Sequence, residues 1–496
     1  MELDRTEPGD VPPLIVAAPE GETHGAGRRE LKAVLRLATP VVLVQIGQLL
    51  FGVVDTMMLG RVSKEALAAG ALGHAISFGI LAVPMGLLMA LDPLVAQAHG
   101  AGDRDRAARH VARGLVAALY LSLPACLLIG GVGPYLGLLR QQPELVPLAS
   151  QYLLALVPGV PAFLLFLTLR QTLQAMSIVR PAMIAVVVAN TINVFANYLL
   201  IFGGLGLPPL GVLGSALATS LSRWTMFLVL ALATGSLLGG AWRRHLRGSW
   251  RLAAQRDLLR IGLPISVHQS LEFWLFTTVG LLMGALGAAE FAGHQIALNL
   301  AALSFMVPLG IAGAAATRVG NAVGRLDASA AKRAATVCLL LGGAVMVVSA
   351  AAFYLLPRQL ARLFTPDTEV LAMAAMLIPV AAAFQIADGT QVVGAGILRG
   401  VADTRFAAIC ALVGFWGIGL PTGILLAFPF RLGPAGLWWG LTAGLAVTAA
   451  LLVLRIRRRL QRPVAELLAE KAPLVDNPSL APHGGAPEEE TPWATR

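Results

Sequence analysis

Charged residues are scarce in this sequence of 496 residues. Asp, Glu, Lys and Arg together make up 13% of it, whereas a soluble globular domain carries about 25%. Apolar residues make up 57%, and the mean hydropathy is +0.74. These values exclude an ordinary soluble protein. Because runs of about twenty apolar residues recur along the chain, the sequence predicts an all-α integral membrane protein rather than a β-barrel.

Other absences narrow the function. The three cysteines, Cys126, Cys338 and Cys410, lie in apolar segments without paired or metal-ligand spacing, so we interpret them as small core residues. The sequence has no GxxxxGK[ST] motif, so we expect no ATP hydrolysis, no cofactor and no enzymatic activity. Residues 1–30 lack the apolar stretch of a signal peptide and predict a disordered tail.

The apolar runs predict twelve membrane-spanning helices in two groups of six. An N-terminal lobe is expected at residues 31–240 and a C-terminal lobe at 258–460. A basic cytoplasmic link at 241–257 joins them, and a second disordered tail occupies 461–496. The predicted spans are 34–59, 66–91, 111–133, 148–169, 181–203, 211–238, 261–283, 290–316, 334–356, 370–397, 406–428 and 434–455.

The Lys and Arg residues predict the orientation of these spans. If the loops are sorted alternately, one set together with the tails holds nearly all of the basic residues. The other set holds only Arg61, Lys64, Arg140, Arg358, Arg362 and Arg431. Because cytoplasmic loops are enriched in Lys and Arg, we expect both termini in the cytoplasm. The net charge of +10 is explained by this topology, and no nucleic-acid partner is expected.

The two halves of the chain are copies of each other. A shift of 224 residues aligns Arg36 with Arg260 and Pro40 with Pro264, and it needs no gap over 79 positions, of which 15 are identical. The matched positions include the glycine pairs Gly86/Gly310 and Gly100/Gly324. Because six spans is an even number, both copies start on the same side of the membrane. The sequence therefore predicts parallel repeats related by an axis along the membrane normal.

Two acidic residues in the spans depart from this repeat. Glu272 lies near the middle of its span and aligns with Gln48, and Asp55 aligns with Val279. A carboxylate at the bilayer centre costs about 2.5–3.5 kcal/mol, so we interpret Glu272 as a functional residue that faces a cavity. The alternative is a protonated Glu bonded to a neighbouring helix. Asp55 is nearer the outer end of its span, where a half-solvated carboxylate is the alternative.

A third acid, Asp388, has amide neighbours. Gln385 and Gln391 lie three residues either side of it, on the same face of a helix. A further stripe of amides lies in the fifth span, at Asn190, Asn193 and Asn197. Two interpretations of this stripe stay open, namely hydrogen bonding between helices and the lining of a cavity.

Two histidine–carboxylate pairs have the spacing of metal ligands. His268 lies one turn before Glu272, and Glu290 lies one turn before His294. Neither pair has a third ligand in view, so the sequence favours hydrogen-bonded helical histidines over a metal site.

Several blocks resemble the multidrug and toxic compound extrusion (MATE) family, in its bacterial NorM-like branch. They are VVDTMMLGRVS at 53–63, PLVAQAHGAGD at 93–103, GLPISVHQSLE at 262–272, AGHQIALN at 292–299, VGNAVG at 319–324 and DGTQVVGAGILRGVADTR at 388–405. The resemblance covers nearly all of residues 31–455. It implies two six-helix lobes around a V-shaped central cavity, and extrusion of organic cations in antiport with Na+ or H+.

The resemblance also assigns residues. The family's membrane carboxylates fall on Asp55 in the N-lobe and on Glu272 and Asp388 in the C-lobe, where Na+ would be held. Phe384 stands where some relatives have a Tyr hydroxyl, which favours H+ over Na+ as the coupling ion. The residues expected to line the cavity around these acids are Gln48, Asn190, Asn193, Asn197, His268, Gln269, Phe384, Gln385 and Gln391.

The expected partners are small cationic or amphipathic drugs and the lipid bilayer, and the protein is expected to act as a monomer. The alternative function is a flippase for lipid-linked oligosaccharide with a related architecture. Such a protein needs cationic residues in its cavity to hold pyrophosphate. Arg223 is the only basic residue that the sequence places well inside a span, against three acids.

The orientation can be tested with reporter fusions. Fusions after residues 61, 140 and 431 should report the outside of the cell, and fusions after 104, 247 and 325 the inside, because the Lys and Arg residues gather in the second set of loops. An external signal from the fusion after residue 247 would contradict both the orientation and the parallel repeat.

Overall fold

The computed structural model describes residues 23–139, 143–204, 206–238 and 240–461. Within these ranges the chain is helical, and the only β-type pairing is an isolated bridge between Gly204 and Leu207. The N-terminal lobe contains α1 (Thr23–Leu59), α2 (Lys64–Leu88), α3 (Leu91–Gly100), α4 (Arg104–Gly131), the 3-10 helix η1 (Gly133–Leu139), α5 (Leu145–Leu156), α6 (Gly159–Ala175), α7 (Arg180–Phe202) and α8 (Gly211–Leu238).

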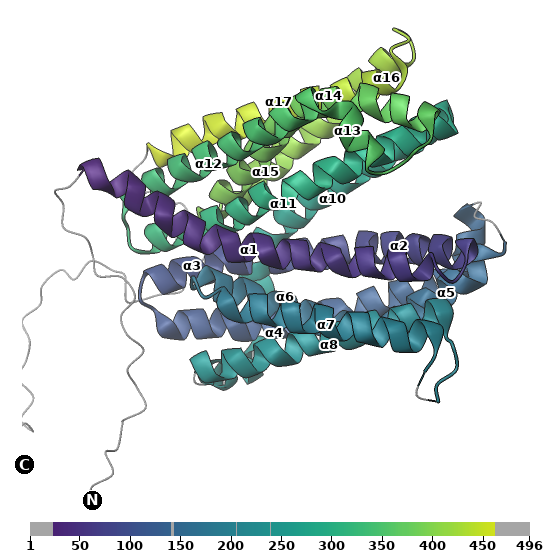
Figure 1. The fold of residues 1–496 in the computed structure, drawn as a ribbon. Helices are drawn as coiled ribbons and strands as arrows, with labels where there is room; N and C mark the ends of the chain where they lie inside the picture. The colour runs from purple at the N-terminus through teal and green to yellow at the C-terminus, as the bar shows by residue number, and fades with distance from the viewer. Residues whose placement is uncertain (1–22, 140–142, 205, 239, 462–496) are drawn as a thin grey trace, which may run out of the picture.

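Short helices form the link, namely η2 (Ala241–His245), α9 (Leu246–Ser249) and η3 (Leu252–Gln255). The C-terminal lobe contains α10 (Arg256–Leu286), α11 (Ala288–Gly324), α12 (Ala328–Leu355), α13 (Pro357–Arg362), α14 (Thr368–Gly400), α15 (Thr404–Ala411), a π-helix (Leu412–Gly419), α16 (Leu420–Ala427) and α17 (Gly433–Leu460). The two lobes occupy the lower and upper halves of the view in Figure 1.

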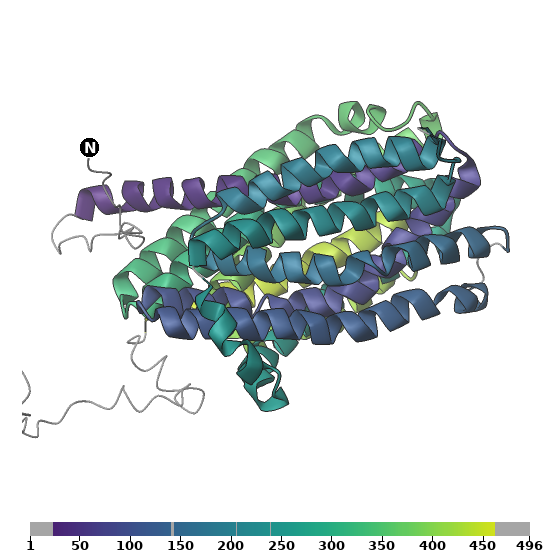
Figure 2. The same cartoon turned by 90° about the horizontal axis from the view of Figure 1, so that it is seen from below.

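The helices confirm the predicted fold class. Among the described residues, eleven helices are long and apolar enough to cross a membrane, and the count becomes twelve if α5 and α6 form one span with a bend of 50°. The bend falls at Val157 and Pro158, between the two helices. The long helices run side by side in one general direction, as Figure 2 also shows. The chain is therefore an all-α protein of two groups of spans.

Some predicted boundaries are wrong. Helix α1 begins at Thr23, so residues 23–30 are helical and the N-terminal tail was predicted eight residues too long. Glu30 in this stretch accepts two hydrogen bonds from the Arg318 guanidinium of α11, at 2.7 and 2.9 Å, and this ion pair holds the helix start in place. Helix α10 begins at Arg256, inside the predicted link. Residues 1–22 and the tail from residue 462 lie outside the described residues.

The N-terminal halves of α1 and α10 are exchanged between the lobes. The α1 residues Val34, Leu37 and Val41 belong to a core built mainly from α11, α12 and α14 of the C-lobe. The α10 residues Leu258, Ile261 and Ile265 belong to a core built from N-lobe helices, among them α2, α3 and α6. Each of the three α1 positions is the repeat partner of one α10 position, so the exchange obeys the internal symmetry.

The lobes meet where α1 packs on α11, α2 on α10, and α3 on α11. We call the end of the bundle at which α3 and α11 end, and at which α4 and α12 begin, the basic end. It lies on the left in Figure 1, where α1 also begins and the arginine-rich last turn of α17 ends. The matched glycines of the repeat lie at these contacts, so they do more than shape single helices.

Gly100 and Gly324 show why glycine is required. A methyl group on Gly100 would lie 2.9 Å from Cα of Asn321, and one on Gly324 would lie 2.9 Å from the carbonyl carbon of Gln97. Gln97 and Asn321 are themselves repeat partners, so each lobe presents the same pair of positions to the other. The axis of the repeat therefore passes between α3 and the end of α11, through a contact made of small residues.

Replacing Gly100 by Ala should lower the melting temperature of the purified protein by several degrees. The added methyl group overlaps Asn321 across the lobe contact, and overpacking of this kind costs about 1–3 kcal/mol. Gly324→Ala should have a similar effect. Gly343→Ala is the matched control, because Gly343 also lies inside a helix and has no atom within 4 Å of the new methyl group. Equal melting temperatures for Gly100→Ala and Gly343→Ala would contradict the close contact.

Candidate functional site

The C-lobe acids lie on two neighbouring helices. Glu272 is on α10 and Asp388 is on α14, the two helices contact each other through His268 and Gln391, and the charge of Glu272 acts unfavourably on the ionised Asp388 carboxylate. Asp388 is 5% exposed, while Glu272 is half-buried. Among the described residues, neither acid forms an ion pair with Lys or Arg. Two mutually repelling carboxylates in an apolar lobe favour binding of a cation or a proton.

Gln391 of α14 contacts His268 of α10. Its side-chain nitrogen lies 3.2 Å from His268 Nε2. An amide nitrogen only donates, so with the amide in this orientation His268 Nε2 is the acceptor and the ring proton lies on Nδ1. His268 is thus a hydrogen-bonded helical residue, whereas both ring nitrogens of the buried His294 have no hydrogen-bond partner in the described structure. No group of three or more metal-ligating side chains occurs among the described residues.

The C-lobe acids are surrounded by polar atoms without partners. The buried atoms Asp388 Oδ1, Gln391 Oε1 and both polar atoms of Gln385 have no hydrogen-bond partner in the described structure. Leaving a buried polar atom unpaired costs about 1–3 kcal/mol, so several in one place point to a functional requirement. Carboxylate and amide oxygens are also the ligands that hard cations prefer. The residues present therefore fit either Na+ or a proton.

Aromatic residues close this site from the side. Phe415 of the π-helix stacks on His268 with ring centroids 6.2 Å apart, and Trp416 donates to the Leu271 carbonyl at 3.1 Å. Phe384 is buried against Trp438 and Phe276, with centroids 5.4 and 6.0 Å away. It brings no oxygen to the acids. The π-helix was not predicted, because it shares its apolar composition with ordinary spans.

Asp55 forms a separate centre in the N-lobe. Asn197 Nδ2 of α7 donates to its Oδ1 at 2.6 Å, and the Thr219 hydroxyl of α8 donates to its Oδ2 at 2.7 Å. Asn197 also donates to the Asn193 side-chain oxygen at 3.1 Å. Asp55 is 6% exposed, so the alternative of a half-solvated carboxylate is wrong. No hydrogen bond among the described residues joins this centre to Glu272 or Asp388.

Three other predicted cavity residues face neighbouring helices. Asn190 donates to the Gly47 carbonyl of α1 at 3.0 Å, which is the interhelical bond considered for the amide stripe. Gln48 accepts a hydrogen bond at 3.2 Å from Arg170, which also donates to Gln45 at 2.7 Å. Gln269 donates to the Met89 sulfur of the N-lobe at 3.4 Å. Arg170, which the sequence placed in a loop, is thus half-buried among helices, as Arg223 is.

An ion pair between the lobes was missed. Asp92 of α3 is 1% exposed, and its Oδ2 lies 3.4 Å from Arg399 Nε of α14. The Asp92 carboxylate accepts no hydrogen bond in the described structure, so the pair is held by charge, to which the nearby Arg170 adds. In the sequence, Asp92 follows an apolar run and precedes Pro93, a pattern typical of a helix-capping or loop residue, but the cap position of α3 is Ala90. The sequence contained one signal for a special role of this residue. Asp92 aligns with Ala316 in the internal repeat, so the acid is not matched in the other copy.

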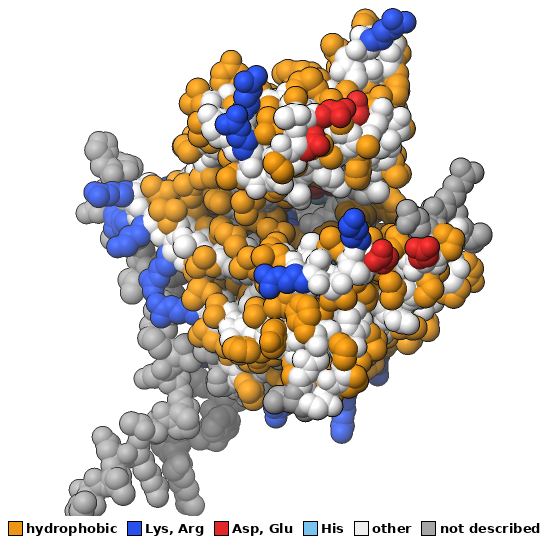
Figure 3. Space-filling model, turned by 45° about the vertical axis from the view of Figure 1, so that its right-hand side comes forward, with side chains coloured by type: hydrophobic (Ala, Val, Ile, Leu, Met, Phe, Trp, Pro, Cys, Tyr) orange, Lys and Arg blue, Asp and Glu red, His pale blue; other side chains and the backbone are white. Residues whose placement is uncertain are grey.

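A neutral hydrogen bond accompanies this ion pair. Gln97 Nε2 of α3 donates to the Gly400 carbonyl of α14 at 2.9 Å, and Asn321 Nδ2 of α11 donates to the Ala175 carbonyl of α6 at 3.2 Å. Both bonds cross between the lobes at the basic end. At the other end, which Figure 3 brings forward, the surface is hollowed between the two lobes.

The fold and these centres define a class of protein, a polytopic membrane transporter with two repeated lobes and buried acids. The MatE family model matches residues 40–199 and 264–425, and the two matches begin 224 residues apart, as the internal repeat does. The chain is 41% identical over 453 residues to the probable multidrug resistance protein NorM of Bradyrhizobium diazoefficiens. The aligned region covers 88% of this chain and 95% of that protein.

Solved structures agree with this family. The fold is similar to that of the eukaryotic MATE transporter AtDTX14, with a TM-score of 0.79, 25% identity, and coverage of 89% of this chain and 99% of that chain. It is also similar to that of a mutant of the Vibrio cholerae MATE transporter VcmN, with a TM-score of 0.78, 17% identity, and coverage of 88% and 98%. The chain belongs to the MatE family of multidrug transporters, which are not enzymes.

Replacing Asp92 by Asn should loosen the basic end. It leaves Arg399 buried without a counter-charge, and breaking a buried pair in this way costs about 3–5 kcal/mol. Hydrogen-exchange mass spectrometry should show faster exchange in Leu91–Gly100 and at the end of α11. A second change, Arg399→Met, should restore part of the protection because it removes the unpaired charge. Asp105→Asn, at an exposed ion pair, is the control. Unchanged exchange in Asp92→Asn would show that the pair does not hold the lobes together.

Proposed function

We propose that this chain exports organic cations and amphipathic drugs from the cytoplasm in antiport with Na+ or H+. It acts as a monomer in a bacterial cytoplasmic membrane, with both termini inside, and needs no ATP or bound cofactor. The observation that carries the proposal is the pair Glu272 and Asp388. These acids repel each other, have no cationic side chain paired with them in the described structure, and lie beside unpartnered oxygens.

The coupling follows from the charge of this pair. A monovalent ion or a proton relieves the repulsion between the carboxylates, and so does a cationic drug. The two ligands therefore compete, either for the same acids or through the conformation that each one favours. The relative named NorM is a probable multidrug resistance protein, which supports drugs as the substrates.

Phe384 favours H+ as the coupling ion. Na+ needs several oxygen ligands, and the aromatic ring one turn before Asp388 offers none, because it is buried against Trp438. A proton needs only the carboxylates themselves. Amide oxygens from Gln385 and Gln391 still offer ligands to Na+, so the test below imposes each gradient separately.

The contacts between the lobes support transport by alternating access. The basic end is closed by the Gly100 and Gly324 contacts, the Asp92–Arg399 pair and two amide hydrogen bonds. The ion pair and the amide hydrogen bonds are polar contacts, so they can be exchanged for contacts at the other end when the lobes rock. Binding of a ligand to the C-lobe acids would then shift the balance between the two arrangements.

The flippase alternative finds no support in the buried arginines. Arg399 is paired with Asp92, and Arg170 is bonded to Gln45 and Gln48. Arg223 lies over the Phe163 ring at 5.1 Å and interacts with the Asp55 charge. Arg399 and Arg170 are thus already bonded to protein side chains, and Arg223 is directed towards a ring and the charge of Asp55, whereas a pyrophosphate would require cations that are free to contact it.

Glu272→Gln and Asp388→Asn should each abolish gradient-driven efflux of a cationic dye from proteoliposomes. Both changes keep shape and hydrogen bonding but remove the charge that couples ion and drug. The protein should still insert, since an amide costs less to bury than a carboxylate. Efflux should be measured under an imposed H+ gradient alone and an imposed Na+ gradient alone.

Glu369→Gln is the matched control, because it removes an exposed carboxylate from the same helix as Asp388. It should leave efflux within about twofold of the unmodified chain. Normal gradient-dependent efflux by the double variant Glu272→Gln, Asp388→Asn would refute the coupling role of the acids. Movement of a lipid-linked oligosaccharide without any dye efflux would favour the flippase instead.

A further inference from the structure

The link between the lobes carries a concentrated positive charge. Residues 241–255 include Arg243, Arg244, Arg247 and Arg251, all exposed, and no Asp or Glu. None of these four arginines forms an ion pair in the described structure. Arg243 lies over the Trp242 ring at 5.6 Å. The surface formed by η2, α9 and η3 is therefore free to bind an anion.

Apolar side chains are exposed on the same short segment. Trp250 is 49% exposed and Leu252 is 75% exposed. A segment that presents arginines together with an exposed Trp and Leu is typical of one that lies in the interface between lipid headgroups and acyl chains. Figure 2 shows the link, in teal, standing out from the side of the helix bundle across the direction of the long helices. Because the long helices cross the membrane, the link therefore runs roughly in the plane of the membrane.

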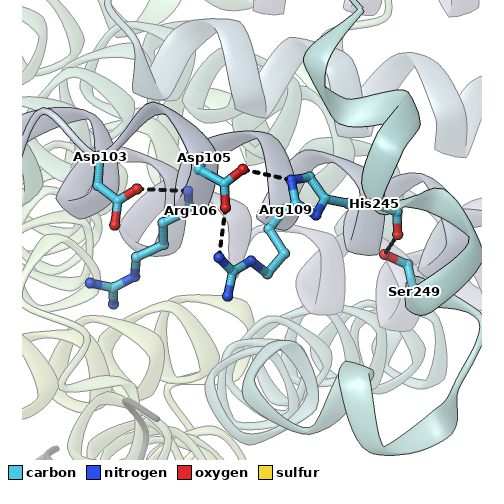
Figure 4. A network of polar contacts seen from close by, with 6 residues as sticks. All are labelled: Asp103, Asp105, Arg106, Arg109, His245 and Ser249. Carbon is cyan, nitrogen blue, oxygen red and sulfur yellow. Dashed lines mark hydrogen bonds and ion pairs between the residues drawn. The ribbon is translucent and has the colours of Figure 1, made fainter. Parts of the chain in front are cut away.

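The link is held rigidly against the N-lobe. Its His245 lies 2.9 Å from Asp105 of α4, and the Ser249 hydroxyl donates to the His245 carbonyl at 2.8 Å (Figure 4). Tyr120 of α4 donates to the Trp250 carbonyl at 2.7 Å, and the two rings pack edge to face with centroids 5.4 Å apart. Beyond the link, Arg113 pairs with Asp257 at 3.1 Å. The arginines are thus presented on an ordered surface.

We propose that the link is a binding surface for the headgroups of anionic phospholipids. Its arginines supply the charge, and Trp250 and Leu252 bury apolar area next to the headgroups. A nucleic acid would also be attracted by the arginines, but it would not be matched by an exposed leucine beside them. Because the link is fastened to α4, the bound lipid would anchor the N-lobe. This proposal depends on the predicted orientation and not on the transport mechanism.

The test uses the full chain in detergent, with phosphatidylglycerol or phosphatidylcholine added in mixed micelles. A ligand that binds only the folded state raises the melting temperature. We expect phosphatidylglycerol to raise it more than phosphatidylcholine does. The variant Arg243→Gln, Arg244→Gln, Arg247→Gln should bind phosphatidylglycerol at least about tenfold more weakly, since each arginine near a membrane surface contributes to the attraction. The corresponding triple change to Lys should keep most of the affinity.

The matched control removes three exposed arginines elsewhere, as Arg358→Gln, Arg362→Gln, Arg431→Gln, with the same change in net charge. It should keep the affinity for phosphatidylglycerol. Equal binding by the link variant and the unmodified chain would overturn the proposal, as would an equal loss in the control. The same stabilisation by free glycerol phosphate would indicate a simple anion site, and tighter binding of a single-stranded oligonucleotide would indicate a nucleic-acid surface; either would overturn it.

Dye efflux in phosphatidylcholine proteoliposomes separates this proposal from the proposed function. The link variant should keep its efflux there, because it leaves Glu272, Asp388 and Asp55 untouched. If Glu272→Gln loses efflux but binds lipid normally, the lipid-binding surface does not depend on the transport site. If the link variant loses lipid binding but keeps efflux, the transport mechanism does not depend on the link. Each proposal can therefore fail alone.

Discussion

The close packing of α3 against the end of α11 is the constraint on which the rest of the structure depends. Lipid tails are as apolar as the helices, so burial of apolar surface gives little drive to hold the lobes together. Close approach of backbones has to supply the attraction, and it requires glycine at Gly100 and Gly324. The same requirement recurs where Gly310 faces Val42. Gly100 and Gly324 are repeat partners, so the same close contact is made from each side of the repeat axis.

The buried acids fall into two kinds that differ in how their charge is met. Asp92 is neutralised by Arg399, so it contributes to the join between the lobes. Glu272 and Asp388 have no such partner in the described structure, and their charge is available to a ligand. Asp55 is intermediate, because Asn197 and Thr219 satisfy its oxygens with neutral donors. The cost of placing each of these acids at membrane depth is thus offset in a different way.

Much of the fold could be predicted from the sequence, because its signals are strong and local. Apolar runs predicted the helices, and a shift of 224 residues predicted the two lobes, which the family matches at 40–199 and 264–425 confirm. The proximity of Glu272 and Asp388, which lie on α10 and α14, was expected only through the resemblance. Their roles in coupling stay predictions.

The remaining features depend on contacts between distant segments. Asp92 and Arg399 are 307 positions apart and meet only because the lobes cross. The rule that singled out Glu272, an acid unmatched in the other copy, applies equally to Asp92, but a following proline made a helix end the simpler interpretation. The π-helix at Leu412–Gly419 has no compositional signal at all, since it differs from its neighbours only in hydrogen-bond register.

The exchanged starts of α1 and α10 mean that the lobes are not separate rigid bodies. Helix α10 anchors Ile261 in the N-lobe and Val279 in the C-lobe, and α1 does the same in reverse with Val41 and Val44. Any rotation of one lobe against the other must therefore bend these two continuous helices. Pro40 and Pro264 lie within the exchanged stretches, and a proline removes one backbone hydrogen bond and lowers the stiffness of a helix locally. In the proposed rocking of the lobes, the two helices around Pro40 and Pro264 would therefore have to deform together with the loop that joins the lobes.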